Sequence, residues 1–268
     1  MPLATEAWPG SIGLVGAGAM GRAFAAGLLR GRPDLAERLL VTDAVPDAVA
    51  VAVADAGGRP VPFEEAAAAD LVCVAVKPGD AGAALESIRA VAAPGATVLS
   101  VIAGWDLDRL EAALPGVALV RTMPNLAVRH GAGVVALATR GLDEAREAAV
   151  RHLLAPLGAV APLPESLFSA ATALAGSGPG LVAVVAEGLE EGAVAAGLTR
   201  VQAREMVQAV LAGTAALLAD GTDPAVLRQR VSSPGGTTIA GVAVLERGAV
   251  RAHVADAVLA AAQRAAGL

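Results

Sequence analysis

The sequence lacks tyrosine and is poor in aromatic residues, cysteine and histidine. Its 268 residues include no Tyr, one Cys, three His, two Trp and three Phe. Without Tyr, the Tyr–Lys proton donor of short-chain dehydrogenases is excluded. The single Cys73 excludes a disulfide framework and a zinc–thiolate site, and it is compatible with a reducing compartment. The three His lie far apart without H-x-x-x-H spacing, so we expect no metal site.

Long basic runs and long apolar runs are also missing. Acidic residues outnumber basic ones by 26 to 20, for a net charge of −6, so we expect no nucleic-acid partner. No stretch reaches about 18 uninterrupted apolar residues, so no transmembrane helix or membrane partner is expected. Residues 1–10 have no basic n-region and do not resemble a secretory signal. The composition favours a cytoplasmic protein that handles small molecules.

Two polar residue types occur only once each. Lys77 is the only lysine and Asn125 the only asparagine of the chain, which is otherwise biased toward Ala, Arg and Gly. A lysine that Arg has not replaced indicates a site that needs a compact ammonium, with chance as the alternative.

Short apolar segments alternate with helical patterns from Ser11 to about Ala161. This alternation predicts βαβ units and a mostly parallel sheet covered by helices on both faces. The predicted strands lie at residues 11–16, 38–43, 70–78, 96–104, 118–125 and 133–140, with a short segment near 59–62, and a helix is predicted at 19–31.

Beyond residues 162–166 the pattern becomes helical. Helices are predicted at residues 167–175, 181–196, 200–219, 224–230, 238–247 and 250–266. The fold class is therefore α/β, with an N-terminal mostly parallel sheet domain at residues 1–163 and a C-terminal all-helical domain at 164–268. The many Ala, Val and Leu residues of the helical half predict a homodimer through that domain.

A G-x-G-x-x-G turn formed by Gly16, Gly18 and Gly21 directly follows the first predicted strand and opens a helix. Glycines allow a tight turn and a close approach of the backbone to a pyrophosphate, which the free N–H groups of the helix N-terminus bind. The pattern predicts a Rossmann-like dinucleotide-binding domain.

Asp43 ends the second predicted strand, about twenty residues after this turn. A carboxylate there suits a ribose 2′-OH and repels a 2′-phosphate, which favours NADH over NADPH. Arg22 and Arg59 are the basic residues that could still approach a 2′-phosphate. A capping or turn role is the alternative for Asp43.

Three further strand ends carry unusual residues at the edge where such sheets bind ligands. They are Lys77 in V-A-V-K-P, the small residues of S-V-I-A-G, and Arg121 and Asn125 in R-T-M-P-N. The alternative is that Lys77 and Arg121 are solvated loop charges and Asn125 a turn former.

Two Gly/Ser/Pro breaks interrupt the helical half, at residues 176–180 and 232–238. Ser, Thr and Gly at a helix start expose N–H groups and hydroxyls together, which suits a carboxylate. A capping role alone would explain Ser233 or Thr237. No strong acid or base is evident, so reduction of a C=N bond fits better than reduction of a ketone.

Taken in order, these residues resemble the pyrroline-5-carboxylate reductase family. The most specific piece is L-R-Q-R-V-S-S-P-G-G-T-T-I-A-G-V-A-V-L-E at 227–246, with A-V-K-P, R-T-M-P-N and G-S-G-P in the expected order. The resemblance covers residues 12 to about 261. It implies reduction of L-1-pyrroline-5-carboxylate to L-proline by NADH or NADPH, in dimers that often assemble into larger rings such as a decamer.

The resemblance also implies roles for site residues. The substrate-binding set is Ser233, Gly235, Gly236, Thr237, Thr238 and Asn125, with Thr238 hydrogen-bonded to the ring nitrogen. Thr238 and Lys77 are the catalytic candidates. The cofactor-binding set is Gly16, Ala17, Gly18, Ala19, Met20, Gly21, Thr42, Asp43, Ala75, Val76, Lys77, Pro78, Ala103 and Gly104.

Some positions depart from the family pattern. Gly180 and Leu181 follow G-S-G-P in place of Ala and an aromatic residue, Pro62 replaces an Asn, and Leu126 replaces a Thr. The first departure widens the pocket, so a larger cyclic imine (piperideine carboxylate or a substituted pyrroline) is an alternative substrate. A β-hydroxyacid dehydrogenase is disfavoured because residues 176–200 contain no Lys, and a non-catalytic NAD(P)-binding sensor is the remaining alternative.

Overall fold

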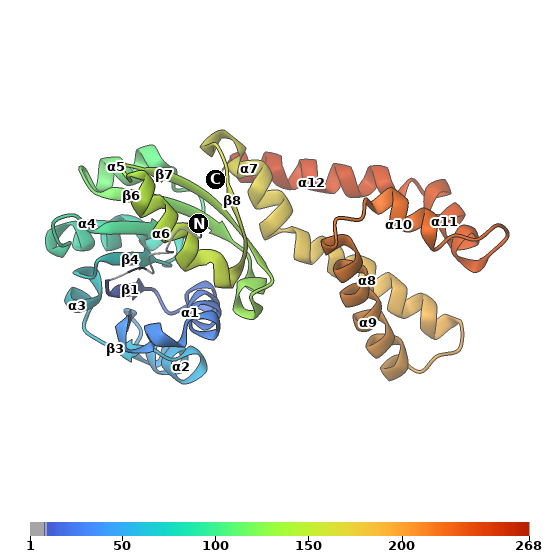
Figure 1. The fold of residues 1–268 in the computed structure, drawn as a ribbon, viewed down its shortest axis with the longest axis horizontal. Helices are drawn as coiled ribbons and strands as arrows, with labels where there is room; N and C mark the ends of the chain where they lie inside the picture. Colours follow the sequence, from blue (N-terminus) through green and yellow to red (C-terminus); the bar gives the residue numbers. More distant parts are fainter. Residues whose placement is uncertain (1–7, 9, 268) are drawn as a thin grey trace, which may run out of the picture. The chain divides into compact units, whose positions relative to one another are not determined.

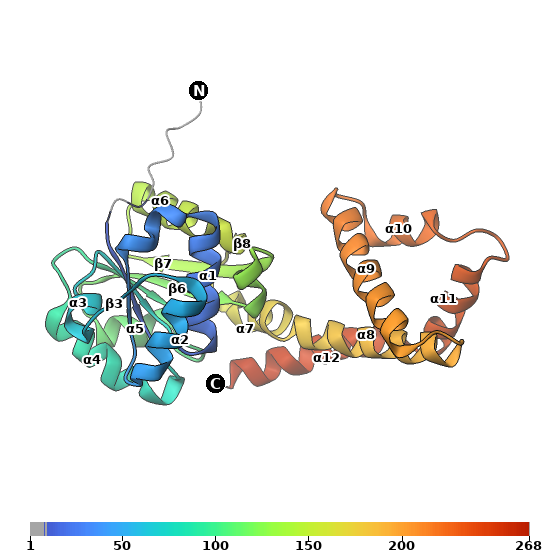
Figure 2. The same cartoon turned by 90° about the horizontal axis from the view of Figure 1, so that it is seen from below.

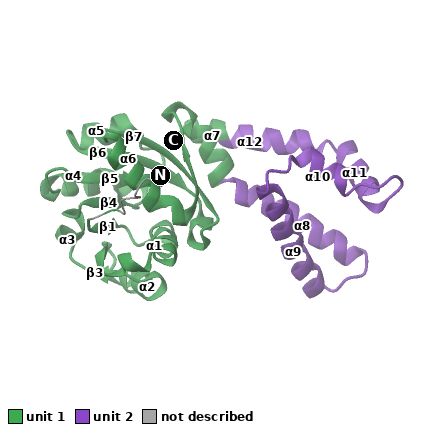
Figure 3. Ribbon diagram, in the orientation of Figure 1, with its two compact units in different colours: residues 1–176, 262–268 green, residues 177–261 purple. Residues whose placement is uncertain are grey.

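The chain divides into two compact units, which Figure 3 distinguishes by colour. The computed structural model describes residue 8 and residues 10–267. The first unit comprises residues 1–176 and 262–268 and contains a sheet, whereas the second, residues 177–261, is helical (Figure 1). The predicted fold class is confirmed. The expected domain boundary between residues 163 and 164 stays a prediction.

The first unit is built on an eight-stranded sheet with the order β3-β2-β1-β4-β5-β6-β7-β8. Every neighbouring pair in it is parallel except β6 and β7, which are antiparallel. Strand β8 was not predicted as a separate strand. The strands are β1 Ile12–Val15, β2 Leu39–Thr42, β3 Arg59–Pro60, β4 Leu71–Val74, β5 Thr97–Ser100, β6 Ala118–Pro124, β7 Gly133–Arg140 and β8 Gly158–Pro162.

Helices cover both faces of this sheet, as the alternating pattern predicts. One core includes residues of α1 (Ala19–Gly31), α2 (Pro46–Ala56) and α6 (Glu144–Leu154). The other includes residues of α3 (Phe63–Ala67), α4 (Ala81–Val91) and α5 (Leu107–Ala113), so the two groups lie on opposite faces (Figure 2). Short 3₁₀ helices connect them: η1 Pro33–Arg38, η2 Pro78–Asp80, η3 Leu126–His130, η4 Ala155–Leu157 and η5 Glu165–Leu167.

The register of the central strands aligns their carboxyl ends. Val15 of β1 pairs with Thr42 of β2 and with Val74 of β4, and Val74 pairs with Ser100 of β5. Strands β1, β4 and β5 are buried along their whole lengths, as expected for a parallel sheet covered on both faces. The loops that follow these four strands therefore leave the sheet at one common edge.

The opposite edge is tied together by the Asp70 carboxylate, which precedes β4. Its Oδ2 accepts hydrogen bonds from the backbone N–H and the hydroxyl of Ser11, both at 2.8 Å, just before β1 begins. These bonds from Ser11 hold the pKa of Asp70 below its usual value. The contact aligns the first residues of the neighbouring strands β1 and β4.

The second unit has almost no core within a single chain. It contains α8 (Gly178–Ala195), α9 (Arg200–Ala219), α10 (Pro224–Arg230), α11 (Thr237–Arg247) and most of α12 (Val250–Ala266). Among residues 177–261, all of which the structure describes, Ala203 and Val207 alone are buried. Val184 is 65% exposed and Val201 is 67% exposed. Such an apolar surface needs a partner to cover it.

By length and composition, one described helix could cross a membrane. It runs from Glu165 to Ala195 through α7 (Phe168–Ala171) and the π-helical segment η6 (Thr172–Gly176), and its apolar window has a mean hydropathy of 1.5 and is 17% buried. The pair α9 and α10, bent by 119° at the break, would pass the same test together. A helix that a second subunit covers has the same composition, and the absence of a membrane partner stays a prediction.

Because the pKa of Asp70 is lowered in the folded chain, its contribution to stability has a defined pH dependence. It is present above the unfolded pKa of about 3.9 and is lost as the pH falls through the lower folded pKa. We expect Asp70→Asn to lower the Tm by about 2–4 °C at pH 7, and the difference to narrow toward pH 3. Thermal unfolding between pH 7 and pH 3 measures this.

Asp256→Asn is the matched control, because that carboxylate is exposed and has no hydrogen-bond partner among the described residues. A difference between wild type and Asp70→Asn that stays constant over this pH range would contradict the predicted linkage.

Candidate functional site

The turn after β1 is closed by a close approach of backbones that only glycine permits. Gly16 has φ +107°, and a Cβ built on it would lie 2.6 Å from the carbonyl carbon and oxygen of Ala75. Its N–H donates to the carbonyl of Thr42 at 2.9 Å. Gly16 therefore packs between the ends of β2 and β4, and any side chain there would push the strand ends apart.

The other two glycines of the motif have different surroundings. A Cβ on Gly21 would lie 2.0 Å from the carbonyl oxygen of Gly16, so Gly21 lets α1 start close to the strand. A Cβ on Gly18 would meet nothing within 4 Å. Gly18 is the N-cap of α1, and no side chain caps this helix. The first N–H groups of α1 thus border an open space, which fits the pyrophosphate of a dinucleotide.

The carboxylate of Asp43 holds this turn from the side of β2. Its Oδ2 accepts from the N–H of Ala17 at 2.6 Å, and its Oδ1 accepts from the N–H of Val45 at 2.9 Å. Asp43 therefore stabilises the turn, which is the alternative role that the sequence left open for it. Each oxygen keeps a second lone pair, so a ribose hydroxyl can still donate to it.

The two arginines considered for a 2′-phosphate both have acidic neighbours. Arg59 lies 3.7 Å from the carboxylate of Glu65. The pKa of Asp55 is lowered mainly by its hydrogen bonds from Arg129, with a smaller contribution from the charge of Arg22. The loop after β2 carries Asp43 itself and no basic residue up to Asp47.

The ends of β4 and β5 bring the remaining predicted cofactor residues to the same edge. After β4, Ala75 and Val76 are half-buried, whereas Lys77 and Pro78 are exposed. No hydrogen bond or ion pair to the Lys77 ammonium occurs within the described ranges. After β5, Ala103 and Gly104 are half-buried, and Gly104 has φ +75°.

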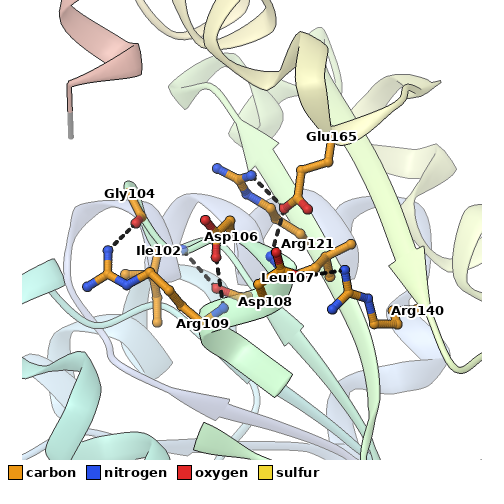
Figure 4. Close-up of polar contacts among 10 residues, drawn as sticks. Ile102, Gly104, Asp106, Leu107, Asp108, Arg109, Arg121, Arg140 and Glu165 are labelled. Carbon is orange, nitrogen blue, oxygen red and sulfur yellow. Dashed lines mark hydrogen bonds and ion pairs between the residues drawn. The ribbon is translucent and has the colours of Figure 1, made fainter. Parts of the chain in front are cut away.

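Arg109 and Trp105 shape the loop after β5. The Arg109 guanidinium donates to the carbonyl of Gly104 at 2.5 Å (Figure 4). It also lies 4.6 Å from the ring centre of Trp105. These contacts fix the conformation of the loop that contains Ala103.

A partly buried ion pair that the sequence did not predict lies beside β6. Glu165 Oε1 accepts from Arg121 Nη1 at 2.6 Å and from the N–H of Leu107 at 2.7 Å (Figure 4). The Arg121 side chain is 13% exposed, and its guanidinium lies 4.5 Å from the ring centre of Phe168. The interpretation of Arg121 as a solvated loop charge is wrong, because it braces β6 to the segment that precedes α7. Nothing in the sequence around Glu165 indicates this pairing.

Asn125, at the end of β6, is buried with one of its two polar groups paired. Its Nδ2 donates to the carbonyl of Ala175 in η6 at 2.9 Å, while its Oδ1 has no partner among the described residues. The predicted substrate loop belongs to the second unit, and the substrate role of Asn125 stays a prediction.

The predicted substrate loop at 232–238 forms a turn between α10 and α11. The N–H of Gly236 donates to the carbonyl of Ser233 at 3.0 Å, and Gly235 has φ +68°. Gly236 is the N-cap of α11, which no side chain caps. A Cβ on Gly236 would lie 2.3 Å from Ser233 Oγ, so glycine keeps this hydroxyl beside the helix start.

Three of the four hydroxyls of this loop have no partner among the described residues, whereas Ser232 Oγ donates to the carbonyl of Arg228 at 2.7 Å. Ser233 and Thr237 are exposed and Thr238 is half-buried, and no hydrogen bond to any of the three hydroxyls occurs among the described residues. Together with the free N–H groups of α11, they form a donor set that suits a carboxylate. Ser233, Gly235, Gly236, Thr237 and Thr238, which the sequence assigned to the substrate, thus lie together in this one loop.

Neither a metal cluster nor a reactive thiol is found in the part of the chain that the structure describes. No group of three or more His, Cys, Asp or Glu side chains there could hold a metal ion. Cys73 is buried in β4, and burial raises the pKa of its thiol.

The same methyl group added at two glycines separates a folding role from a binding role. Gly18→Ala adds a Cβ to open space at normal φ, so we expect a wild-type Tm and NADH binding that is about tenfold weaker. Gly16→Ala is the matched comparison and should lower stability by about 1–3 kcal/mol through strain and crowding. Fluorescence titration and thermal unfolding measure both. Unchanged NADH binding by Gly18→Ala would contradict the assignment of this turn.

Two family models match the two parts of the chain. Residues 165–268 match the model described as pyrroline-5-carboxylate reductase dimerisation, and residues 11–104 match that described as NADP oxidoreductase coenzyme F420-dependent.

Relatives match along nearly the whole chain. The pyrroline-5-carboxylate reductase of Synechocystis is 35% identical over 94% of this chain and 96% of its own length, and that of Thermus thermophilus is 37% identical over the same shares. The solved structure of the enzyme from Coxiella burnetii is 30% identical, with a TM-score of 0.87 over 96% of this chain and 98% of that one. The chain therefore belongs to the pyrroline-5-carboxylate reductase family.

Proposed function

We propose that this protein reduces L-1-pyrroline-5-carboxylate to L-proline with a reduced nicotinamide dinucleotide. The observation that carries the proposal is that its relatives match over 94% of the chain, while the two family models cover the glycine turn of the first unit and the 232–238 loop of the second. A dinucleotide turn on a sheet edge and a carboxylate-binding loop are the two parts that this reaction needs.

On the first unit, the glycine turn and the start of α1 would hold the pyrophosphate. Asp43 would accept hydrogen bonds from the adenosine ribose, while Val76, Pro78 and Ala103 would line the path toward the nicotinamide. The exposed ammonium of Lys77 would bind an oxygen of the cofactor through its charge and donors. When bound, the reduced nicotinamide supplies the hydride to the imine carbon.

On the second unit, the loop would fix the substrate by its acid group. The N–H groups at the start of α11 and the hydroxyls of Ser233 and Thr237 would donate to the carboxylate. Thr238, one residue further into α11, would hydrogen-bond the ring nitrogen and orient the imine carbon. The nitrogen needs one proton in the reaction, which water or the Thr238 hydroxyl would deliver.

The acidic loop after β2 supports NADH as the preferred cofactor. Asp43 and Asp47 would repel a 2′-phosphate, and the two candidate arginines, Arg22 and Arg59, have acidic neighbours. Gly180 and Leu181 leave room for a larger ring, so a substituted pyrroline or piperideine carboxylate is the second candidate substrate.

The exposed apolar helices support a homodimer through the second unit, whose matching family model is one of dimerisation. Assembly of dimers into a decamer, and a cytoplasmic location, stay predictions from the sequence.

Removing the Thr238 hydroxyl should slow the reaction more than it weakens binding. Because Val has nearly the same shape, Thr238→Val should lower kcat by about tenfold or more with a small change in KM for the imine. Thr214→Val is the matched control, since Thr214 is an exposed threonine of α9 without a hydrogen-bond partner among the described residues. Wild-type kcat in Thr238→Val would refute the assigned role.

A panel of cyclic imino acids, each assayed with NADH and with NADPH, tests the function itself. We expect the highest kcat/KM with L-1-pyrroline-5-carboxylate and NADH, because the loop holds the carboxylate and the loop after β2 repels a 2′-phosphate. Faster turnover of a six-membered imine would reassign the substrate, and a strong NADPH preference would contradict the role of Asp43. Dinucleotide binding without oxidation by any imine would indicate a sensor.

A further inference from the structure

The buried amide of Asn125 is a polar group that the local structure leaves half satisfied. The residue is 8% exposed, and its Oδ1 is buried without a hydrogen-bond partner among the described residues. A buried acceptor of this kind costs stability unless a donor reaches it. Such a group therefore points to a donor from outside the described residues, such as a bound ligand.

The orientation of the Asn125 amide is fixed by the hydrogen bond of its NH₂ group. Nδ2 donates to the carbonyl of Ala175 at 2.9 Å, and a carbonyl can only accept. Turning the amide over would set Oδ1 against that carbonyl and lose the bond. The group left without a partner is thus the acceptor, and the missing ligand group must be an N–H or O–H donor.

The contact also lies at an unusual backbone segment. Ala175 belongs to η6, one turn of π-helix between α7 and α8. Single π-helical turns inside α-helices are frequent at functional sites, and their irregular hydrogen bonding leaves carbonyls that a side chain can pair. Asn125 therefore anchors this turn to the end of β6.

The position of Asn125 in the sheet selects the ligand. Asn125 follows β6, which is the third strand from β1 in the order β1-β4-β5-β6, or about 14 Å along the edge at a spacing of about 4.8 Å. The glycine turn lies at β1, and Val76 and Ala103 follow β4 and β5. An extended dinucleotide with its pyrophosphate at the turn has its nicotinamide end toward β5 and β6.

We propose that Asn125 Oδ1 accepts a hydrogen bond from the carboxamide N–H₂ of the nicotinamide, while Nδ2 keeps its bond to Ala175. Asn125 is then a residue that orients the nicotinamide ring, rather than one that binds the substrate as the sequence suggested. The inference rests on the proposed function, since it requires a bound nicotinamide dinucleotide.

A double-mutant cycle between protein and ligand tests this pair. The two probes are NADH and reduced 3-acetylpyridine adenine dinucleotide, in which a methyl group replaces the carboxamide N–H₂. Fluorescence titration gives the Kd of each probe for wild type and for Asn125→Ala. We expect wild type to bind NADH about tenfold more tightly than the analogue and Asn125→Ala to bind both about equally. Any loosening of η6 would affect both probes alike, so the ratio isolates the hydrogen bond.

Asn125→Leu keeps a side chain of similar size without the amide. It serves as the second variant if Asn125→Ala is too unstable to be titrated. Thr122→Val is the matched control on the same strand, because it removes the buried hydroxyl that donates to the carbonyl of Ser100 at 3.0 Å. It should keep the tenfold ratio.

The outcomes separate this inference from the proposed function. A wild-type ratio in both Asn125 variants, or no preference in wild type, overturns the role of Asn125 and leaves the function standing. If wild type binds neither probe, the proposed function falls and this inference falls with it.

Discussion

Backbone crowding at the carboxyl end of β1 is the constraint on which the rest of the first unit depends. Gly16 packs against the carbonyl of Ala75, and Gly21 packs against the carbonyl of Gly16. A Cβ on either glycine would clash with the carbonyl that it faces. Because these approaches are possible, α1 starts close to the sheet and its free N–H groups lie at the edge where β2, β4 and β5 end. A Cβ on Gly18, by contrast, would meet nothing within 4 Å, so packing among the described residues does not require a glycine there.

The two units differ in how much of their apolar surface is buried within one chain. The sheet unit has a core on each face, whereas Ala203 and Val207 are the buried residues of 177–261. The helical unit therefore depends on a partner subunit, and its stability should be coupled to protein concentration. Because the 232–238 loop lies in this unit, the order of the proposed substrate site is linked to assembly.

Much of the fold could be predicted because local patterns and tertiary packing agree. The apolar runs at 12–15, 71–74 and 97–100 are strands buried on both faces, and a continuous run of Val, Leu and Ile indicates this. The antiparallel pairing of β6 with β7 and the short strand β8 were not predicted. Neither the direction in which two strands pair nor a short edge strand produces a distinctive pattern of apolar residues in the sequence. The Arg121–Glu165 bond joins residues 44 positions apart, so local sequence contains no trace of it.

The sequence by itself determined the glycine turn, the acidic end of β2 and the Ser/Gly/Thr loop, because each depends on neighbouring residues whose backbone freedom and donors are properties of the residue types. Only the tertiary structure decided that Asn125 pairs with Ala175 and leaves an acceptor without a partner among the described residues, and that Arg121 is half-buried in an ion pair. Those outcomes depend on which distant segments meet at a strand end. Burial and the choice of hydrogen-bond partner are properties of the packed chain.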